Sequence, residues 1–187
     1  MTTALSEVRV LGLGNVLMGD DAFGPWVIEQ LLNDWDFPEG VTVTDVGTPG
    51  LDLTPYLADA DAILLVDTVK ADAPPGTLKV YPREKLLACP AKPRLSPHDP
   101  GLTEALGTLT LGGCAPRDIT LIGAVPEKVE KGVGLTPALR RAVDAAVSEV
   151  VVALIKLGLA PARKTGAGAA VFPWWERPAP GATATAV

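Results

Sequence analysis

The chain has 187 residues, 48% of them hydrophobic, and this length and composition suffice for one domain with a continuous core. Its formal net charge of −6 excludes a general binder of nucleic acids or anionic membranes, because such surfaces need clustered Lys and Arg. The first residues lack the basic and apolar stretches of a secretory signal, and Cys89 and Cys114 form no CxxC pair. We therefore expect a cytoplasmic protein without a disulfide framework or a thiolate metal site.

The first two elements are a strand and a helix. The apolar run 8–13 predicts a buried strand, because it is rich in β-branched residues and ends at a Gly-Asn turn. Apolar side chains then recur every fourth residue between Phe23 and Trp35, as on the buried face of a helix. We expect Asp20 or Asp21 to cap the start of this helix.

Three further strands are expected in the middle of the chain. Residues 41–45 alternate between apolar and polar, and the turn 47–50 leads into a short helical stretch at 51–57. Residues 62–67 are continuously apolar until the final aspartate, which is typical of a central parallel strand covered on both faces. Residues 78–81 follow a Pro-Pro-Gly turn and predict an edge strand.

The second half of the chain predicts two helices and one strand. Residues 89–100 contain four prolines and indicate a loop, after which 102–111 return to helical spacing. Residues 119–123 form the last expected strand. Thr136 precedes a proline and is placed to cap a helix over 137–159, whose charged residues exclude a plain transmembrane span.

Strands that alternate with helices at this spacing predict an α/β three-layer sandwich, a mostly parallel twisted sheet of about five strands with helices on both faces. We assign residues 1–159 to this domain and 160–187 to an Ala/Pro/Gly-rich tail that we expect to be flexible. Phe172, Trp174 and Trp175 interrupt the tail. These aromatics either fold back onto the domain or form a docking patch for a partner.

The turn after the first strand does not fit a nucleotide. Residues 12–19 superficially match GxGxxG, but the third glycine is misplaced, and no GK[ST] follows as in a Walker A loop. Asp20 and Asp21 stand where a pyrophosphate would lie, and their charge would repel it. The acidic pair is better suited to a cation.

A second carboxylate and the only histidine complete a candidate metal site. Asp67 ends the strand 62–67, and the carboxyl ends of strands form the ligand crevice of open α/β sheets, so Asp67 and Asp21 are expected to converge there. His98 lies in a loop stiffened by prolines, beside Asp99. Two carboxylates and one imidazole suit nickel, zinc, manganese or cadmium, with coordination positions left open. A turn-capping aspartate or a solvated histidine is the alternative for each residue.

Six segments, in order and spacing, resemble the hydrogenase maturation endopeptidases. They are GNVLMGDDAFG at 14–24, DVGTPGLDL at 45–53, LLVDTV at 64–69, SPHDPGL at 96–102, DITLIGAVPE at 118–127 and GVGLTPALRRAV at 132–143. The resemblance implies a phosphorylase/hydrolase-like fold and an aspartic-type endopeptidase. It also implies that Asp21, Asp67 and His98 are the catalytic and metal-binding residues.

The substrate implied by this resemblance is the large-subunit precursor of a [NiFe] hydrogenase, whose C-terminal extension is removed after nickel insertion. The precursor would supply the nickel, so no permanent cofactor is expected. The family often has glutamate in place of Asp21 and usually glycine in place of Ala22, which leaves Asp20 as an alternative ligand. Two rival functions are a non-catalytic nickel-sensing chaperone of the large subunit, which would use the same ligands, and a hydrolase-like or nucleotide-binding enzyme unrelated to hydrogenases.

Overall fold

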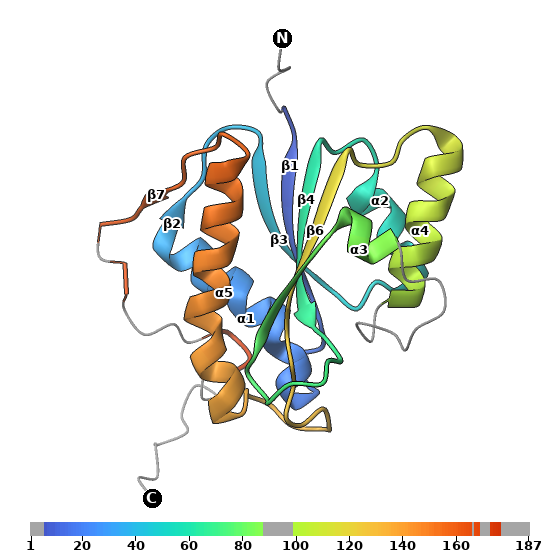
Figure 1. The fold of residues 1–187 in the computed structure, drawn as a ribbon. Coiled ribbons are helices and arrows are strands. Elements are labelled where there is room, and N and C mark those ends of the chain that lie inside the picture. Colours follow the sequence, from blue (N-terminus) through green and yellow to red (C-terminus); the bar gives the residue numbers. More distant parts are fainter. Residues whose placement is uncertain (1–5, 88–98, 166, 169–172, 177–187) are drawn as a thin grey trace, which may run out of the picture.

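A five-stranded sheet forms the centre of the computed structural model, which describes residues 6–87, 99–165, 167–168 and 173–176 (Figure 1). Its order is β3-β1-β4-β6-β5, with bounds β1 (Val8–Leu13), β3 (Val41–Gly47), β4 (Ala62–Thr68), β6 (Asp118–Ala124) and β5 (Leu78–Pro82). The first four strands run parallel, and β5 pairs antiparallel with β6 at the edge. The predicted mostly parallel sheet of about five strands is confirmed.

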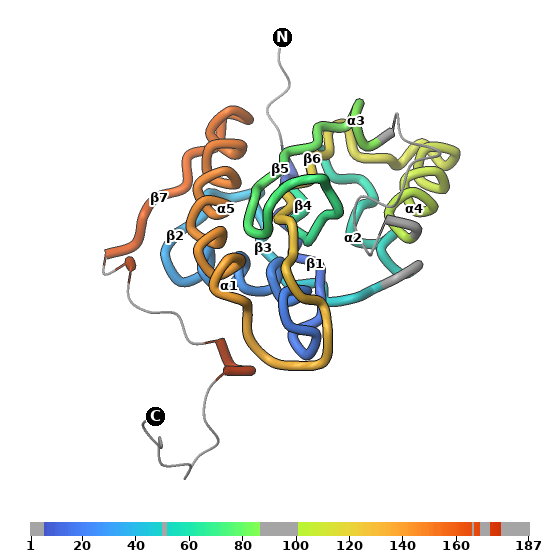
Figure 2. The backbone as a smooth tube through the Cα atoms, turned by 60° about the horizontal axis from the view of Figure 1, so that its bottom comes forward, coloured from blue at the N-terminus to red at the C-terminus, as the bar shows by residue number. Residues whose placement is uncertain are grey.

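Helices cover both faces of the sheet and complete three layers (Figures 1 and 2). One face carries α1 (Phe23–Asp34) and α5 (Pro137–Lys156), and the other carries α2 (Thr54–Leu57), α3 (Arg83–Leu87) and α4 (Asp99–Gly112). The buried residues of β4 alternate between two apolar cores, with Leu64 and Val66 on the α1/α5 side and Ile63 and Leu65 on the other. Within the described ranges, no helix combines the length and apolarity needed to cross a membrane.

The two predicted helix caps have opposite outcomes. Thr136 caps α5 as expected, because its side chain accepts a hydrogen bond from the Leu139 N–H at 3.5 Å. The cap predicted for α1 is wrong. Its N-cap residue is Ala22, without a side-chain bond, and Asp20 and Asp21 lie in a preceding 3-10 turn, η1 (Gly19–Ala22). Their carboxylates bond to other segments, which sequence spacing does not reveal.

The stretch that follows α5 packs against the domain wherever it is described. The short strand β7 (Ala162–Arg163) pairs antiparallel with β2 (Trp35–Asp36), which follows α1. The Lys164 N–H donates to the Asp34 carbonyl at 2.8 Å. The buried Asp34 carboxylate accepts hydrogen bonds from the Gly168 N–H at 3.0 Å and from Gln30 at 2.7 Å. These bonds tie β7, Lys164 and Gly168 to the end of α1.

A second contact joins the aromatic segment to both helices of that face. Trp175 meets Trp26 of α1 edge-on, with ring centres 6.2 Å apart. The Arg140 guanidinium of α5 lies 3.7 Å from the centre of the Trp26 ring and pairs with Glu176 at 3.0 Å. Trp175 therefore packs on its own domain, whereas Trp174 is largely exposed and Phe172 lies outside the described residues.

Replacement of Asp34 by Asn should destabilise the fold in a pH-dependent manner. Burial alone would raise the pKa of Asp34, but the bonds from Gly168, Gln30 and Asn33 outweigh it and lower the pKa. A carboxylate whose pKa is lower in the folded than in the unfolded state stabilises the folded protein at any pH above its unfolded-state pKa. This stabilisation is lost as the pH falls through the folded-state pKa. At pH 7 we expect a loss of about 1 kcal/mol, or roughly 2–4 °C in melting temperature, and this loss should become smaller as the pH falls below 3.8.

The matched control is Asp36→Asn. Asp36 is exposed, and its one ion pair among the described residues is a long one, with 3.8 Å between its carboxylate oxygen and the Lys164 Nζ atom. This change should leave the melting temperature nearly unaltered. Thermal unfolding of the three proteins across the pH range measures the effect. An Asp34→Asn deficit that is equal at pH 3 and pH 7 would contradict the assignment.

Candidate functional site

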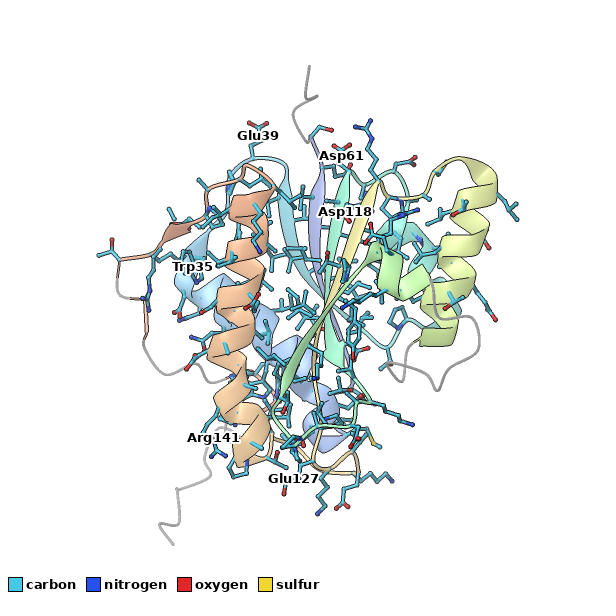
Figure 3. All side chains as sticks on the ribbon, viewed as in Figure 1. Trp35, Glu39, Asp61, Asp118, Glu127 and Arg141 are labelled. Atoms are coloured by element: carbon cyan, nitrogen blue, oxygen red, sulfur yellow. The ribbon has the colours of Figure 1, made fainter. Side chains whose placement is uncertain are left out.

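The candidate site lies where the sheet changes direction. From β1 the chain moves to β3 on one side and then to β4 on the other, so β1 lies between them. The crevice outside the carboxyl ends of such strands is the usual ligand position in open α/β sheets. This end of the molecule also carries Glu127, whereas Glu39, Asp61 and Asp118 mark the opposite end (Figure 3). Asp21 and Asp67 follow β1 and close β4 at this crevice.

Two glycines allow η1 and α1 to lie directly on these strand ends. A Cβ atom at Gly24 would overlap the carbonyl oxygens of Leu13 in β1 and Val66 in β4. Gly14 has φ +140°, and a Cβ there would overlap the Asp21 carbonyl oxygen. The close approach brings the acidic pair against both strands.

Asp20 is fully buried, and its carboxylate accepts hydrogen bonds from the loop between β6 and α5. One oxygen accepts the Thr136 N–H at 2.7 Å. The other accepts the Glu127 and Lys128 N–H groups at 2.8 and 2.9 Å and lies 3.1 Å from the Thr136 hydroxyl. Four donors use the accepting capacity of one carboxylate. Asp20 therefore anchors this loop, which argues against it as the alternative metal ligand.

Asp21 has fewer partners and lies against β4. One of its oxygens accepts the Asn15 N–H at 2.9 Å, and the other is 3.5 Å from the Thr68 hydroxyl. The side chain is largely buried, at the crevice end of the sheet. Its position leaves oxygen lone pairs for a further ligand.

Asp67 is linked to the same threonine. Its carboxylate accepts the Thr68 N–H at 2.7 Å, so Thr68 contacts Asp67 through its backbone and Asp21 through its hydroxyl. Sequence reasoning did not single out Thr68 or Asn15, although both stand inside the quoted motifs. Because strand side chains alternate, Asp67 shares the face of Leu65 and Val69, the face that α2 and α4 cover.

His98 lies outside the described residues, directly before the first residue of α4. The buried residues of α4 belong to the same core as Leu65 and Val69, so α4 covers the sheet face that Asp67 shares. No group of three His, Cys, Asp or Glu side chains able to hold a metal occurs among the described residues. The three-residue site of Asp21, Asp67 and His98 thus stays a prediction, with two members placed at one crevice.

A third carboxylate, Asp45, lies near the end of β3 beside Gly12 of β1. Its side chain reaches solvent, yet the atoms packed around it desolvate the carboxylate and raise its pKa. A hydrogen bond from the Gly47 N–H at 2.9 Å partly offsets this rise. Sequence analysis quoted this segment but did not single out Asp45, which adds an acidic group on the β3 side of the crevice.

The two adjacent aspartates should differ sharply when each is truncated. Asp20→Ala removes the buried acceptor of four donors, and we expect a loss of about 3 kcal/mol, or roughly 6–12 °C in melting temperature. Asp21→Ala removes one short hydrogen bond and should cost about 1 kcal/mol. Calorimetry on both variants measures the difference. Equal destabilisation would mean that the two carboxylates do not divide their roles as described.

Comparison with known proteins agrees with this architecture. The family model described as hydrogenase maturation protease matches residues 25–153. The hydrogenase 2 maturation protease of Escherichia coli K12 is 34% identical over 155 residues, which cover 82% of this chain and 93% of that protein. The hydrogenase expression/formation protein HoxM of Azotobacter vinelandii is 34% identical over 169 residues, covering 83% of this chain and 82% of that protein.

Solved structures lead to the same family. The hydrogenase maturating endopeptidase HybD of Escherichia coli superposes with a TM-score of 0.77 at 32% identity, over 84% of this chain and 98% of that one. The [NiFe] hydrogenase maturation protease HybD of Thermococcus kodakarensis has a TM-score of 0.64 at 26% identity, over 77% and 96% of the two chains. The chain therefore belongs to the hydrogenase maturation protease family and is a peptidase.

Proposed function

We propose that the protein is a cytoplasmic endopeptidase that removes the C-terminal extension of a [NiFe]-hydrogenase large-subunit precursor after nickel has been inserted. The observation that carries the proposal is the pair of carboxylates at the switch point of the sheet, joined through Thr68. Family membership supplies the reaction class. The pair supplies oxygen ligands at the crevice where a substrate chain would lie.

The nickel in this proposal belongs to the precursor. Asp21, Asp67 and His98 would provide two oxygens and one imidazole nitrogen, which is an incomplete shell for nickel. The remaining ligands would come from the precursor, so the three side chains complete the shell only when the metal is already in place. The three side chains would then detect directly whether the precursor holds nickel, and the protease would need no permanent cofactor.

The chemistry favours a carboxylate over a side-chain nucleophile, which supports the aspartic-type subclass. The sequence contains one histidine, and our proposal assigns it to nickel. Cys114 lies near the start of β6, away from the crevice, and the nearby negative charge of Asp59 raises its pKa and disfavours the thiolate. A crevice carboxylate acting as general base would take a proton from water as it attacks the scissile carbonyl. The proton would then pass to the departing amide nitrogen.

Nickel-dependent cleavage is the direct test. Intact-mass spectrometry of a cognate precursor should show loss of a C-terminal peptide only when the precursor is nickel-loaded. His98→Ala and Asp67→Asn should abolish the loss, whereas Asp118→Asn, at the opposite end of the sheet, should retain it. An unchanged mass with verified nickel loading and binding would favour the chaperone function, which uses the same three ligands without cleavage.

Thr68 should be a positioning residue for the carboxylate pair. Thr68→Val keeps the shape and the N–H bond to Asp67 but removes the hydroxyl that lies 3.5 Å from Asp21. We expect kcat for the loaded precursor to fall about tenfold, equivalent to about 1.4 kcal/mol in the barrier, with little change in KM. Thr68→Ser should restore kcat. A Thr68→Val enzyme with normal kcat, or with only KM changed, would contradict this role.

A further inference from the structure

Two loops are joined side by side at the crevice end of the molecule (Figures 1 and 2). They are residues 14–19, which connect β1 to η1 and include its first residue, and residues 125–136, which connect β6 to α5. Together we call them the rim. The Gly19 N–H donates to the Gly132 carbonyl at 2.8 Å, and the Gly132 N–H donates to the Leu17 carbonyl at 3.0 Å. The rim is therefore a single paired structure.

The rim presents large apolar side chains to solvent. Leu17 is 59% exposed, Val133 53% and Val129 45%. Beside them lies a hollow of about 180 Å³. Its lining includes Gly19, Gly132 and Gly134, which leave backbone accessible, together with the charged residues Lys128, Glu130 and Lys131. Large exposed apolar side chains that gather around a hollow are typical of a surface that binds another protein.

The rim is also held rigid from beneath. The buried Asp20 carboxylate bonds to the Glu127, Lys128 and Thr136 N–H groups, and the Asp20 N–H donates to the Lys128 carbonyl at 3.1 Å. Gly134 also lies next to Glu176, which pairs with Arg140 of α5. Loops fixed in this way lose little conformational entropy when a partner binds.

We infer that the rim docks an apolar patch of the folded large-subunit precursor beside its C-terminal extension. This inference rests on the proposed function. We assign the precursor to the rim because a protease must hold a protein chain at its crevice, and the rim adjoins the crevice. Asp20 anchors the rim, and Asp21, the next residue, lies at the crevice. The rim carries two exposed glutamates, Glu127 and Glu130, and two exposed lysines, Lys128 and Lys131, so its formal net charge is zero, and the Lys128 and Glu130 side chains pair at 2.7 Å. Apolar contact, rather than charge, would then supply the affinity.

Binding of the nickel-loaded precursor to rim variants tests the inference. Leu17→Asp and Val133→Asp should each raise Kd at least about tenfold, because they place a charge in an apolar contact. Val133→Ser, a milder change, should weaken binding by a smaller factor. Raising the ionic strength should alter Kd of the unmutated protein by less than about threefold. In steady-state cleavage, the rim variants should raise KM and leave kcat nearly unchanged.

The matched control is Ile155→Asp, because Ile155 is 57% exposed at the far end of α5, away from the rim. Its Kd should stay within about twofold of the unmutated value. Rim variants that fold, bind and cleave as well as this control would overturn the inference while leaving the proposed function intact. An unmutated protein that binds the precursor without cleaving it would overturn the endopeptidase proposal alone. Failure of the unmutated protein to bind the loaded precursor would overturn both.

Discussion

The buried carboxylate of Asp20 is the interaction on which the crevice depends. A charge without solvent must be matched by donors, and here three backbone N–H groups and one hydroxyl come from a loop more than a hundred residues further along the chain. The bonds hold the β6–α5 loop against η1 and fix the start of α5. Asp21, the next residue, is thereby held against β4. The hydrogen bonds to the Asp20 carboxylate therefore set the geometry of the crevice.

The acidic pair thus divides into an anchor and a carboxylate with fewer protein partners. Asp20 has its accepting capacity filled by protein donors, whereas Asp21 accepts one short bond and lies near the Thr68 hydroxyl. Thr68 also bonds to Asp67, so a single residue couples the two strand ends. Glycine at 24 makes this coupling possible, because any side chain there would separate η1 and α1 from β1 and β4. Close packing and hydrogen bonding act together on the same few atoms.

Under the proposed function, this arrangement would serve an enzyme whose substrate is a folded protein that carries its own metal. The crevice would contribute an incomplete ligand set, and the adjoining rim would hold the partner by apolar contact. Recognition of the metal and recognition of the protein surface would then occur on neighbouring segments, fixed to each other through Asp20. The C-terminal contact of Trp175 with Trp26 and of Glu176 with Arg140 braces α1 and α5, the two helices that follow these segments.

The sequence by itself determined the five strands of the central sheet, the helices α1, α2, α4 and α5 and the candidate residues Asp21, Asp67 and His98, but it indicated neither α3 nor the pair β2 and β7. Strand and helix periodicity are local, and the carboxyl ends of parallel strands meet at one edge whatever the loops do. Only the tertiary structure decided which aspartate anchors the fold, because the donors to Asp20 are distant in sequence. The pattern of spacing wrongly predicted that the acidic pair caps α1, and it did not reveal Thr68, because these contacts too join residues distant in sequence. The packing of Trp175 on Trp26 likewise depends on a long-range contact that composition does not encode.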